Sequence, residues 1–283
     1  MKLKILTLIV TGSAILFYGT NQIKVSSLES EKSNLKMYVL DGGYMVVNDL
    51  SYFTQDESYN GQKKIIDNPV FIIEHEKGRL IWDVGLPDRL ADRNPSEIDT
   101  TQWILFYVKE KLIDQIHNMN MTPDSFDYII VSHSHSDHIG NANYFKTSTW
   151  IVDERELEWA MREKANTKNY DSLLTAQTAV FKGKFDVFGD NSVIVHSMPG
   201  HTPGHMILQI ELKNETLFLS GDLYHFNEQR QFRRVPQFNY DVDKTLESMN
   251  RFEELVNKLN AKVIIQHERN DYKELPVYPE YWE

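Results

Sequence analysis

The chain of 283 residues contains no cysteine. Disulfide bonds, thiolate metal ligands and a cysteine nucleophile are therefore excluded. Any bound metal ion has to be held by histidine, aspartate and glutamate side chains. Because cysteine-free proteins occur in every redox compartment, this absence does not decide where the protein resides.

Basic residues are also scarce, with 30 Lys and Arg against 41 Asp and Glu, so the net charge is −11. An acidic surface argues against a nucleic-acid partner, because phosphate binding needs clustered Lys and Arg. No internal repeat, low-complexity tract or nucleophile-elbow pattern is present in the sequence. The apolar content of 41% is that of an ordinary globular protein with a substantial hydrophobic core.

The most apolar stretch, residues 5–18, is short for a membrane-spanning helix. It follows Lys2 and Lys4, and a basic start before a short apolar run is typical of a secretory signal peptide. We predict a signal peptide over residues 1–22, a polar linker over 23–35 and one folded domain over 36–283. The protein would then be exported, periplasmic or secreted, without stable membrane insertion of the mature domain. An uncleaved membrane anchor and a buried N-terminal element are the alternatives.

Hydrophobic periodicity in the remaining chain predicts strands first, and then strands alternating with helices. This order favours a layered α/β domain with sheets inside and helices outside, although it does not fix the topology. The predicted strands cover residues 36–40, 44–47, 70–74, 80–83, 128–131, 193–195, 206–211, 216–219 and 263–265, and the predicted helices cover 100–118, 153–165 and 243–259.

The residues with the clearest chemistry form the run His133-Ser134-His135-Ser136-Asp137-His138, directly after an apolar strand. Alternate residues of an extended segment point the same way, so His133 and His135 can converge on one metal ion. Asp137 and His138 can face a second position nearby. Imidazole and carboxylate ligands suit zinc, and also iron, manganese or cobalt.

Further ligands have to come from elsewhere in the chain. His201 lies in the Gly- and Pro-rich loop after the 193–195 strand, Asp222 follows the 216–219 strand, and His267 follows the 263–265 strand. Each residue alone is a weak signal. Because each follows an apolar strand, we expect them at one end of a sheet, beside the histidine run.

These motifs, together with Asp83 in Trp82-Asp83-Val84-Gly85, resemble those of the metallo-β-lactamase-fold hydrolases, in the same order along the chain. The resemblance covers residues 36 to the C-terminus and implies an αβ/βα four-layer sandwich of two mixed sheets with helices outside. It implies that His133, His135 and His201 hold one metal ion, that Asp137, His138 and His267 hold another, and that Asp222 bridges them. Asp83 would orient a ligand histidine from behind.

Within this superfamily the chain is most similar to the N-acyl homoserine lactone lactonases. That group implies two zinc ions, a hydroxide held between them that opens the lactone ring, and an acyl homoserine lactone as the small-molecule partner. Asp137 would also orient the hydroxide and protonate the leaving group. In the group a tyrosine three residues after the bridging aspartate contacts the substrate carbonyl; here that position is His225, and Tyr224 precedes it. Both are candidate catalytic residues.

An acyl chain needs an apolar wall beside the metal ions. Candidates for this wall lie in two segments before the histidine run: Trp103, Ile104, Phe106 and Tyr107 in one, and Met45, Val46 and Val47 in the other.

Two other functions remain open at this stage. One is a hydrolase of the same fold that acts on another lactone or ester, a thioester or a β-lactam. The other is a non-catalytic metal-binding domain, which the retained Asp137 and the seven-residue ligand set disfavour, because a structural zinc site needs only four ligands. The sequence leaves the acyl length, the native metal and the oligomeric state undetermined.

Overall fold

The computed structural model describes residues 34–162 and 167–283. The predicted signal peptide and all of the predicted linker except its last two residues lie outside this described part. Leu35, the last of them, is buried in the core, so the packed domain includes it. In the described residues no helix is both long enough and apolar enough to cross a membrane.

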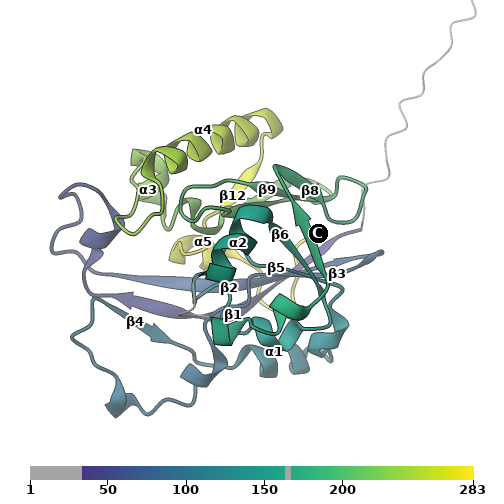
Figure 1. Cartoon of the computed structure of the whole chain (residues 1–283), viewed down its shortest axis with the longest axis horizontal. Helices are drawn as coiled ribbons and strands as arrows, with labels where there is room; N and C mark the ends of the chain where they lie inside the picture. Colours follow the sequence, from purple (N-terminus) through teal and green to yellow (C-terminus); the bar gives the residue numbers. More distant parts are fainter. Residues whose placement is uncertain (1–33, 163–166) are drawn as a thin grey trace, which may run out of the picture. The chain divides into compact units, whose positions relative to one another are not determined.

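Two mixed sheets form the centre of the domain (Figure 1). Sheet A has seven strands in the order β4-β1-β2-β3-β5-β6-β7, antiparallel from β4 to β3 and parallel from β3 to β7. Its strands are β1 (Lys36–Val47), β2 (Lys64–His75), β3 (Gly78–Trp82), β4 (Ile104–Tyr107), β5 (Tyr128–Ile130), β6 (Thr149–Asp153) and β7 (Thr178–Phe181).

Sheet B has five strands in the order β12-β11-β10-β9-β8. All its pairs are antiparallel except β11 with β12, which run parallel. Its strands are β8 (Lys184–Asp186), β9 (Val193–Ser197), β10 (Met206–Glu211), β11 (Thr216–Leu219) and β12 (Lys262–Ile264).

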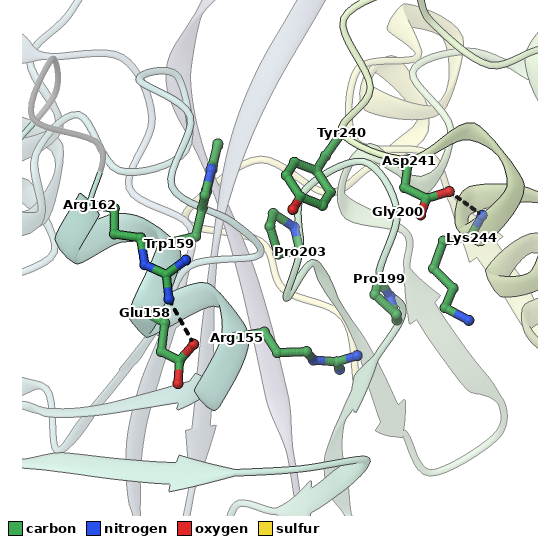
Figure 2. Close-up of a pocket in the computed structure, with 10 residues that line it drawn as sticks. All are labelled: Arg155, Glu158, Trp159, Arg162, Pro199, Gly200, Pro203, Tyr240, Asp241 and Lys244. Atoms are coloured by element: carbon green, nitrogen blue, oxygen red, sulfur yellow. Dashed lines mark hydrogen bonds and ion pairs between the residues drawn. The ribbon is translucent and has the colours of Figure 1, made fainter.

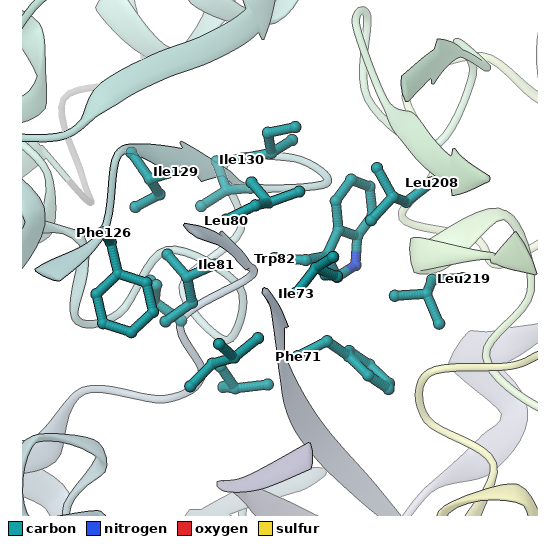
Figure 3. Packing of buried hydrophobic residues seen from close by; sticks show 14 of the residues in the cluster. Phe71, Ile73, Leu80, Ile81, Trp82, Phe126, Ile129, Ile130, Leu208 and Leu219 are labelled. Atoms are coloured by element: carbon teal, nitrogen blue, oxygen red, sulfur yellow. The ribbon is translucent and has the colours of Figure 1, made fainter. Parts of the chain in front are cut away.

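The main core lies between the two sheets. Figure 3 shows Phe71 and Trp82 of sheet A pointing towards Leu208 and Leu219 of sheet B, and all four are fully buried. Burying side chains of this size contributes about 1.5–3 kcal/mol each relative to leaving them in water. This interface fixes how the ends of the two sheets meet, and therefore where the loops at those ends lie.

Helices cover the outer faces of both sheets (Figure 1). Helix α4 packs Met249, Phe252 and Val256 against Ile207 and Phe218 of sheet B. Leu112 and Ile116 of helix α1 belong to the main hydrophobic cluster, which contains most of the buried apolar residues of sheet A. The α-helices are α1 (Leu112–Asn118), α2 (Glu154–Arg162), α3 (Asn227–Phe232), α4 (Val242–Leu259) and α5 (Arg269–Glu274). The predicted layered fold of two mixed sheets with helices outside is confirmed.

The two predicted strands at 36–40 and 44–47 are one strand, β1, and no turn separates them. Its pairing with β2 shifts register between Asp41 and Tyr44, which marks a bulge. A side chain on Gly42 would meet the Asn68 carbonyl oxygen at 2.4 Å, so the glycine permits a close backbone approach there. The Gly42-Gly43 pair therefore bends the strand without ending it.

The predicted helix over 100–118 is wrong in its first half. Residues 104–107 form β4, which pairs antiparallel with residues 44–47 of β1, and the helix begins only at Leu112. Short apolar runs fit a strand as well as a helix, and pairing with β1 decides between them here. The consequence is functional, because a strand places Ile104 and Phe106 on one face.

Candidate active site

Three imidazoles converge at the carboxyl ends of strands from both sheets. His133 and His135 follow β5, and His201 lies in the loop between β9 and β10. His133 Nε2 lies 2.9 Å from His135 Nδ1 and 3.2 Å from His201 Nε2, and the last two atoms are 3.0 Å apart. Three ring nitrogens thus point at one common position.

A second group of donors lies beside the first. His138 Nε2 is 3.3 Å from His267 Nε2 and also 3.3 Å from Asp137 Oδ2. Asp137 Oδ2 lies 3.6 Å from His267 Nε2. The structure therefore brings His267 to the adjacent pair Asp137 and His138, although 129 positions separate His267 from His138 in the sequence.

Asp222 belongs to both groups. Its Oδ2 atom faces the first, at 3.3 Å from His201 Nε2 and 3.6 Å from His133 Nε2. Its Oδ1 atom faces the second, at 3.0 Å from His267 Nε2 and 3.2 Å from His138 Nε2. The carboxylate is only 3% exposed, and Oδ1 has no well-aligned hydrogen bond among the described residues. One carboxylate oxygen is thus directed to each group.

These donors fit a pair of divalent cations. A tetrahedral zinc ion with bonds of 2.0–2.1 Å to nitrogen separates its nitrogen ligands by roughly 3.3 Å, close to the separations seen here. Four side chains surround each position: His133, His135, His201 and Asp222 in the first group, and Asp137, His138, His267 and Asp222 in the second. Nitrogen and oxygen donors without sulfur suit zinc, iron, manganese or cobalt.

The protonation of the first group suits metal binding. Burial holds the pKa of His133 well below its usual value and lowers the pKa of His135 to about 3. Both rings are therefore neutral at physiological pH, which is the form that binds a metal ion.

The second group is dominated by carboxylates. Burial disfavours charge on Asp222 and Asp137, but the surrounding imidazoles, His138 foremost, hold the pKa of both carboxyls below the usual range. Burial likewise lowers the pKa of His138 and His267, yet the neighbouring carboxylates, Asp222 foremost, leave it raised. The negative charge of the carboxylates thus favours binding of positive charge at this position, either as protons or as a metal ion.

Polar partners behind the ligands hold several rings in place. Asp83, predicted to orient a ligand histidine, lies with its Oδ2 atom 2.9 Å from His138 Nδ1. The same oxygen accepts hydrogen bonds from Ser132 Oγ at 3.0 Å and Gln266 Nε2 at 2.6 Å. Partners of this kind fix the orientation of a ligand imidazole and raise its basicity.

His201 and His267 are oriented in the same way. His201 Nδ1 lies 3.0 Å from the side-chain oxygen of Asn239, and His267 Nδ1 lies 2.8 Å from the backbone carbonyl oxygen of Asp67. In both rings a proton on Nδ1 leaves Nε2 free as the ligand atom.

His205, four residues after His201, holds the backbone of Asp222. Its Nε2 accepts from the Asp222 backbone N–H at 2.9 Å, while Nδ1 lies 3.1 Å from the Met198 carbonyl. Gly221 precedes Asp222 with φ of +48°, and a side chain there would lie 2.6 Å from His205 Nε2. The glycine thus allows this close contact.

Of the two candidate catalytic residues after Asp222, only His225 lies at the site. Its Nε2 atom is 3.1 Å from Asp222 Oδ2. Tyr224 points the other way: it packs against α4, and its hydroxyl donates to Glu253 Oε1 at 3.0 Å. The structure therefore does not place Tyr224 where it could contact a substrate at the metal ligands.

Gln229 fixes the ring of His225. The Gln229 amide donates to the Phe53 carbonyl at 2.7 Å, and its Oε1 accepts from the His225 backbone N–H at 2.8 Å. Both ring nitrogens of His225 face acceptors, because Gln229 Oε1 lies 3.1 Å from Nδ1 and Asp222 Oδ2 lies 3.1 Å from Nε2. Burial lowers the pKa of His225. A neutral ring carries one hydrogen and can donate it to one of these two oxygens.

An apolar cavity of about 210 Å³ opens onto the donor groups. Four of the residues predicted for a substrate wall line it: Trp103, Ile104, Phe106 and Met45. Tyr107 does not, because alternation along β4 turns it to the other face, where it stacks on Tyr44. Val47 is also absent from the lining and is buried in the cluster beneath.

Three further apolar residues of this cavity have no distinctive signal in the sequence. They are Phe53, Ile66 and Phe238. Phe53 lies edge-on to His225 with ring centroids 5.0 Å apart, and Phe238 lies 5.2 Å from Phe53. Phe238 is distant in the sequence from the other two, so only the folded chain brings the three together.

A second cavity, of about 340 Å³, has Trp159 as one of its lining residues (Figure 2). Trp159 separates it from the donors by packing edge-on against His135, with centroids 5.7 Å apart. The basic side chains that line it already have acidic partners: Arg155 pairs with Asp153, Arg162 with Glu158 and Lys244 with Glu247. Among the described residues, each basic side chain that lines this cavity thus has an acidic partner.

A family model supports the assignment that the donor geometry suggests. Residues 67–267, which contain Asp83 and all seven donors, match the model of the metallo-beta-lactamase superfamily. The chain belongs to this superfamily. The predicted resemblance and the fold type that it implies are confirmed.

Curated relatives to which the chain is similar include N-acyl homoserine lactonases. The chain is 27% identical over 244 residues to the N-acyl homoserine lactonase AttM of Azorhizobium caulinodans, covering 79% of this chain and 90% of the relative. It is 26% identical over 225 residues to the N-acyl homoserine lactonase AiiA of Bacillus thuringiensis subsp. kurstaki, covering 77% and 88%.

Solved structures agree with this placement. An N-acyl homoserine lactone hydrolase with the product N-hexanoyl-L-homoserine bound at its catalytic metal centre is 25% identical, with a TM-score of 0.76 over 87% of this chain and 98% of that one. The dizinc lactonase AidC, at 15% identity and a TM-score of 0.64 over 84% and 89%, shares the fold.

Proposed function

We propose that this chain hydrolyses the ring ester of N-acyl homoserine lactones with the help of two divalent metal ions, zinc by default. The observation that carries the proposal is the arrangement of two donor groups, joined through Asp222, at the polar end of an apolar cavity. The lactonase relatives support the same substrate class. The cavity provides room for an apolar acyl chain beside a polar reacting group.

His133, His135 and His201 would hold one ion, Asp137, His138 and His267 the other, and Asp222 both. When bound, two such ions lower the pKa of water towards neutrality and polarise the carbonyl that water attacks. Cysteine and serine nucleophiles are not needed for this chemistry.

The protein side chains contribute positioning and proton transfer. Phe53, Trp103 and Phe106 would hold the acyl chain and exclude water from the reacting carbonyl. Attack by water forms a bond between its oxygen and the carbonyl carbon, the ring C–O bond then breaks, and the alkoxide that leaves needs a proton. Asp137 lies at the boundary between donors and cavity, where its carboxyl can pass that proton from the attacking water.

The proposed function is tested by assaying ring opening of hexanoyl- and decanoyl-homoserine lactone by the purified full chain. Proton release reports turnover, and a panel of another ester, a glutathione thioester and a β-lactam reports selectivity. We expect turnover of the acyl homoserine lactones that a chelator abolishes and zinc restores. Faster turnover of another member of the panel would assign the site to that substrate class.

His225 presents one ring nitrogen to the cavity. Its Nε2 atom lies beside Asp222 Oδ2, while Nδ1 faces Gln229 Oε1. Water can both donate and accept hydrogen bonds, so it can pair with Nε2 in either tautomer of the ring. We therefore propose that His225 orients the attacking water.

We expect His225→Phe to lower kcat by about 10²-fold, in the range typical of acid–base and water-orienting groups, while two metal ions remain bound. Metal analysis and steady-state kinetics of the same preparation check this. Tyr224→Phe is the matched control, since its hydroxyl contacts Glu253 and not the site; its kcat should equal that of the parent. Parallel loss of metal and turnover in His225→Phe would make His225 a structural residue.

We also propose that the protein is exported through its N-terminal segment. Residues 1–22 carry the basic start and short apolar run that support this proposal. Fractionation of expressing cells, with N-terminal sequencing of the product, tests it: full-length protein in the cytosolic fraction would contradict export.

A further inference from the structure

A buried glutamate lies behind the first donor group and belongs to none of the roles assigned above. Glu156, in the first turn of α2, is fully buried, although its neighbours Arg155 and Glu158 are exposed. A buried carboxylate is costly unless its oxygens are hydrogen-bonded. Its partners therefore show what it does.

Each carboxylate oxygen of Glu156 serves one loop. Oε1 accepts from the backbone N–H of Ser134 at 2.8 Å and from the Ser134 hydroxyl. Oε2 accepts from the Thr202 hydroxyl at 2.6 Å and from the backbone N–H of Gly204 at 3.1 Å. One side chain thus joins the loop after β5 to the loop before β10.

Three of the four donors belong to residues next to ligands of the first metal position, and the fourth, Gly204, is three residues after His201. Ser134 lies between His133 and His135, and Thr202 follows His201 directly. Ser134 is three residues before Asp137, and Thr202 and Gly204 lie in a loop that carries no ligand of the second position. The backbone fit is also close, because a side chain on Gly204 would lie 2.2 Å from the Glu156 backbone nitrogen.

We propose that Glu156 is a positioning residue that sets the separation of the two loops carrying the first metal position. This rests on the proposed function, in which His133, His135 and His201 hold a metal ion. The residue acts through the backbone of Ser134 and Gly204, and does not touch substrate or metal.

Glu156→Gln provides a near-isosteric test. The amide replaces one oxygen by an NH₂ group. The hydroxyl of Ser134 or Thr202 can rotate to accept from it, but the backbone N–H on that side cannot. One loop therefore loses its backbone anchor, whichever way the amide turns.

The experiment measures zinc affinity by competition with a chromophoric chelator in the full chain. In a His267→Gln background, which leaves the first position intact, we expect Glu156→Gln to weaken zinc binding by about 10- to 100-fold, as do other changes behind metal ligands. In a His133→Gln background, which leaves the second position, the affinity should not change. Glu158→Gln, on the exposed side of the same helix, is the matched control in both backgrounds.

Equal loss in the two backgrounds, or no loss in the first, would overturn the proposal. If Glu156→Gln lowers the melting temperature of the metal-free chain so far that it cannot be titrated, Thr202→Val removes one of the four hydrogen bonds and should weaken the first position in the same direction. A parent chain that does not bind two zinc ions would refute the proposed function itself. That outcome is distinct from failure of the Glu156 role, in which the parent binds two ions and Glu156→Gln does not weaken the first position selectively.

Discussion

Asp222→Ala should lose both metal ions and lower kcat/KM by on the order of 10³-fold or more. Changes to residues behind metal ligands lower metal affinity or activity by about 10- to 100-fold, and removing a ligand that both ions share should have a larger effect. The reason is the division of its carboxylate, with Oδ2 towards His201 and Oδ1 towards His267. No other described side chain belongs to both donor groups.

The loop that carries Asp222 should survive this substitution. Its backbone N–H, which donates to His205 Nε2, is retained in alanine. Metal analysis, kinetics and circular dichroism of one preparation therefore separate loss of the site from loss of the fold. His133→Ala is the comparison, because it removes a ligand of the first position only. An Asp222→Ala protein that keeps two ions would contradict the bridging role.

Asp83→Ala should lower the free energy of unfolding by about 3 kcal/mol or more, since each buried donor left unpaired costs about 1–3 kcal/mol. Those donors are the N–H of Ser132, His138 Nδ1 and the amide of Gln266. Asp83 also has φ of +53°, a conformation in which alanine is less favourable than aspartate or asparagine.

The same substitution should weaken the second metal position by about 10- to 100-fold, because His138 loses the partner that orients it. Asp83→Asn is the control, since it retains one acceptor oxygen and tolerates the left-handed backbone. Its losses should be smaller in both quantities. Urea unfolding and zinc titration check them. Parent-like metal affinity in Asp83→Ala would show that the Asp83–His138 contact does not matter for binding.

The two donor groups were predictable because their signal is local and repeated. Each donor segment follows an apolar strand, but the strands belong to two sheets, β5 to sheet A and β9, β11 and β12 to sheet B, and not to the single sheet expected from the sequence. His201, Asp222 and His267 assemble beside residues 133–138, although nothing in the sequence gives their separations. The division of Asp222 between the groups required the coordinates.

The cavity was only partly predictable, because its walls depend on pairing between distant segments. Residues 104–107 fit a helix as well as a strand by their spacing, and only pairing with β1 turns Phe106 into the cavity and Tyr107 out of it. Phe53 and Phe238 lie far apart in the sequence, yet their rings contact each other and both contact His225.

Positioning residues were the hardest to foresee. Glu156 lies in the acidic and basic run of α2, where a glutamate is ordinarily solvent-exposed. Gln229 likewise lies in a polar helical segment whose residues would be expected at the surface, yet it is fully buried against His225. Their roles depend on which face of a short helix packs inward, which spacing alone did not establish.

The central claim is that two metal ions held by these seven side chains open a lactone ring. It is tested most directly by adding zinc stepwise to the metal-stripped full chain while measuring bound metal and hydrolysis of hexanoyl-homoserine lactone in the same samples. We predict that binding saturates at two ions per chain and that turnover rises with occupancy. Saturation below two ions, or turnover that persists in the stripped protein, would contradict the account.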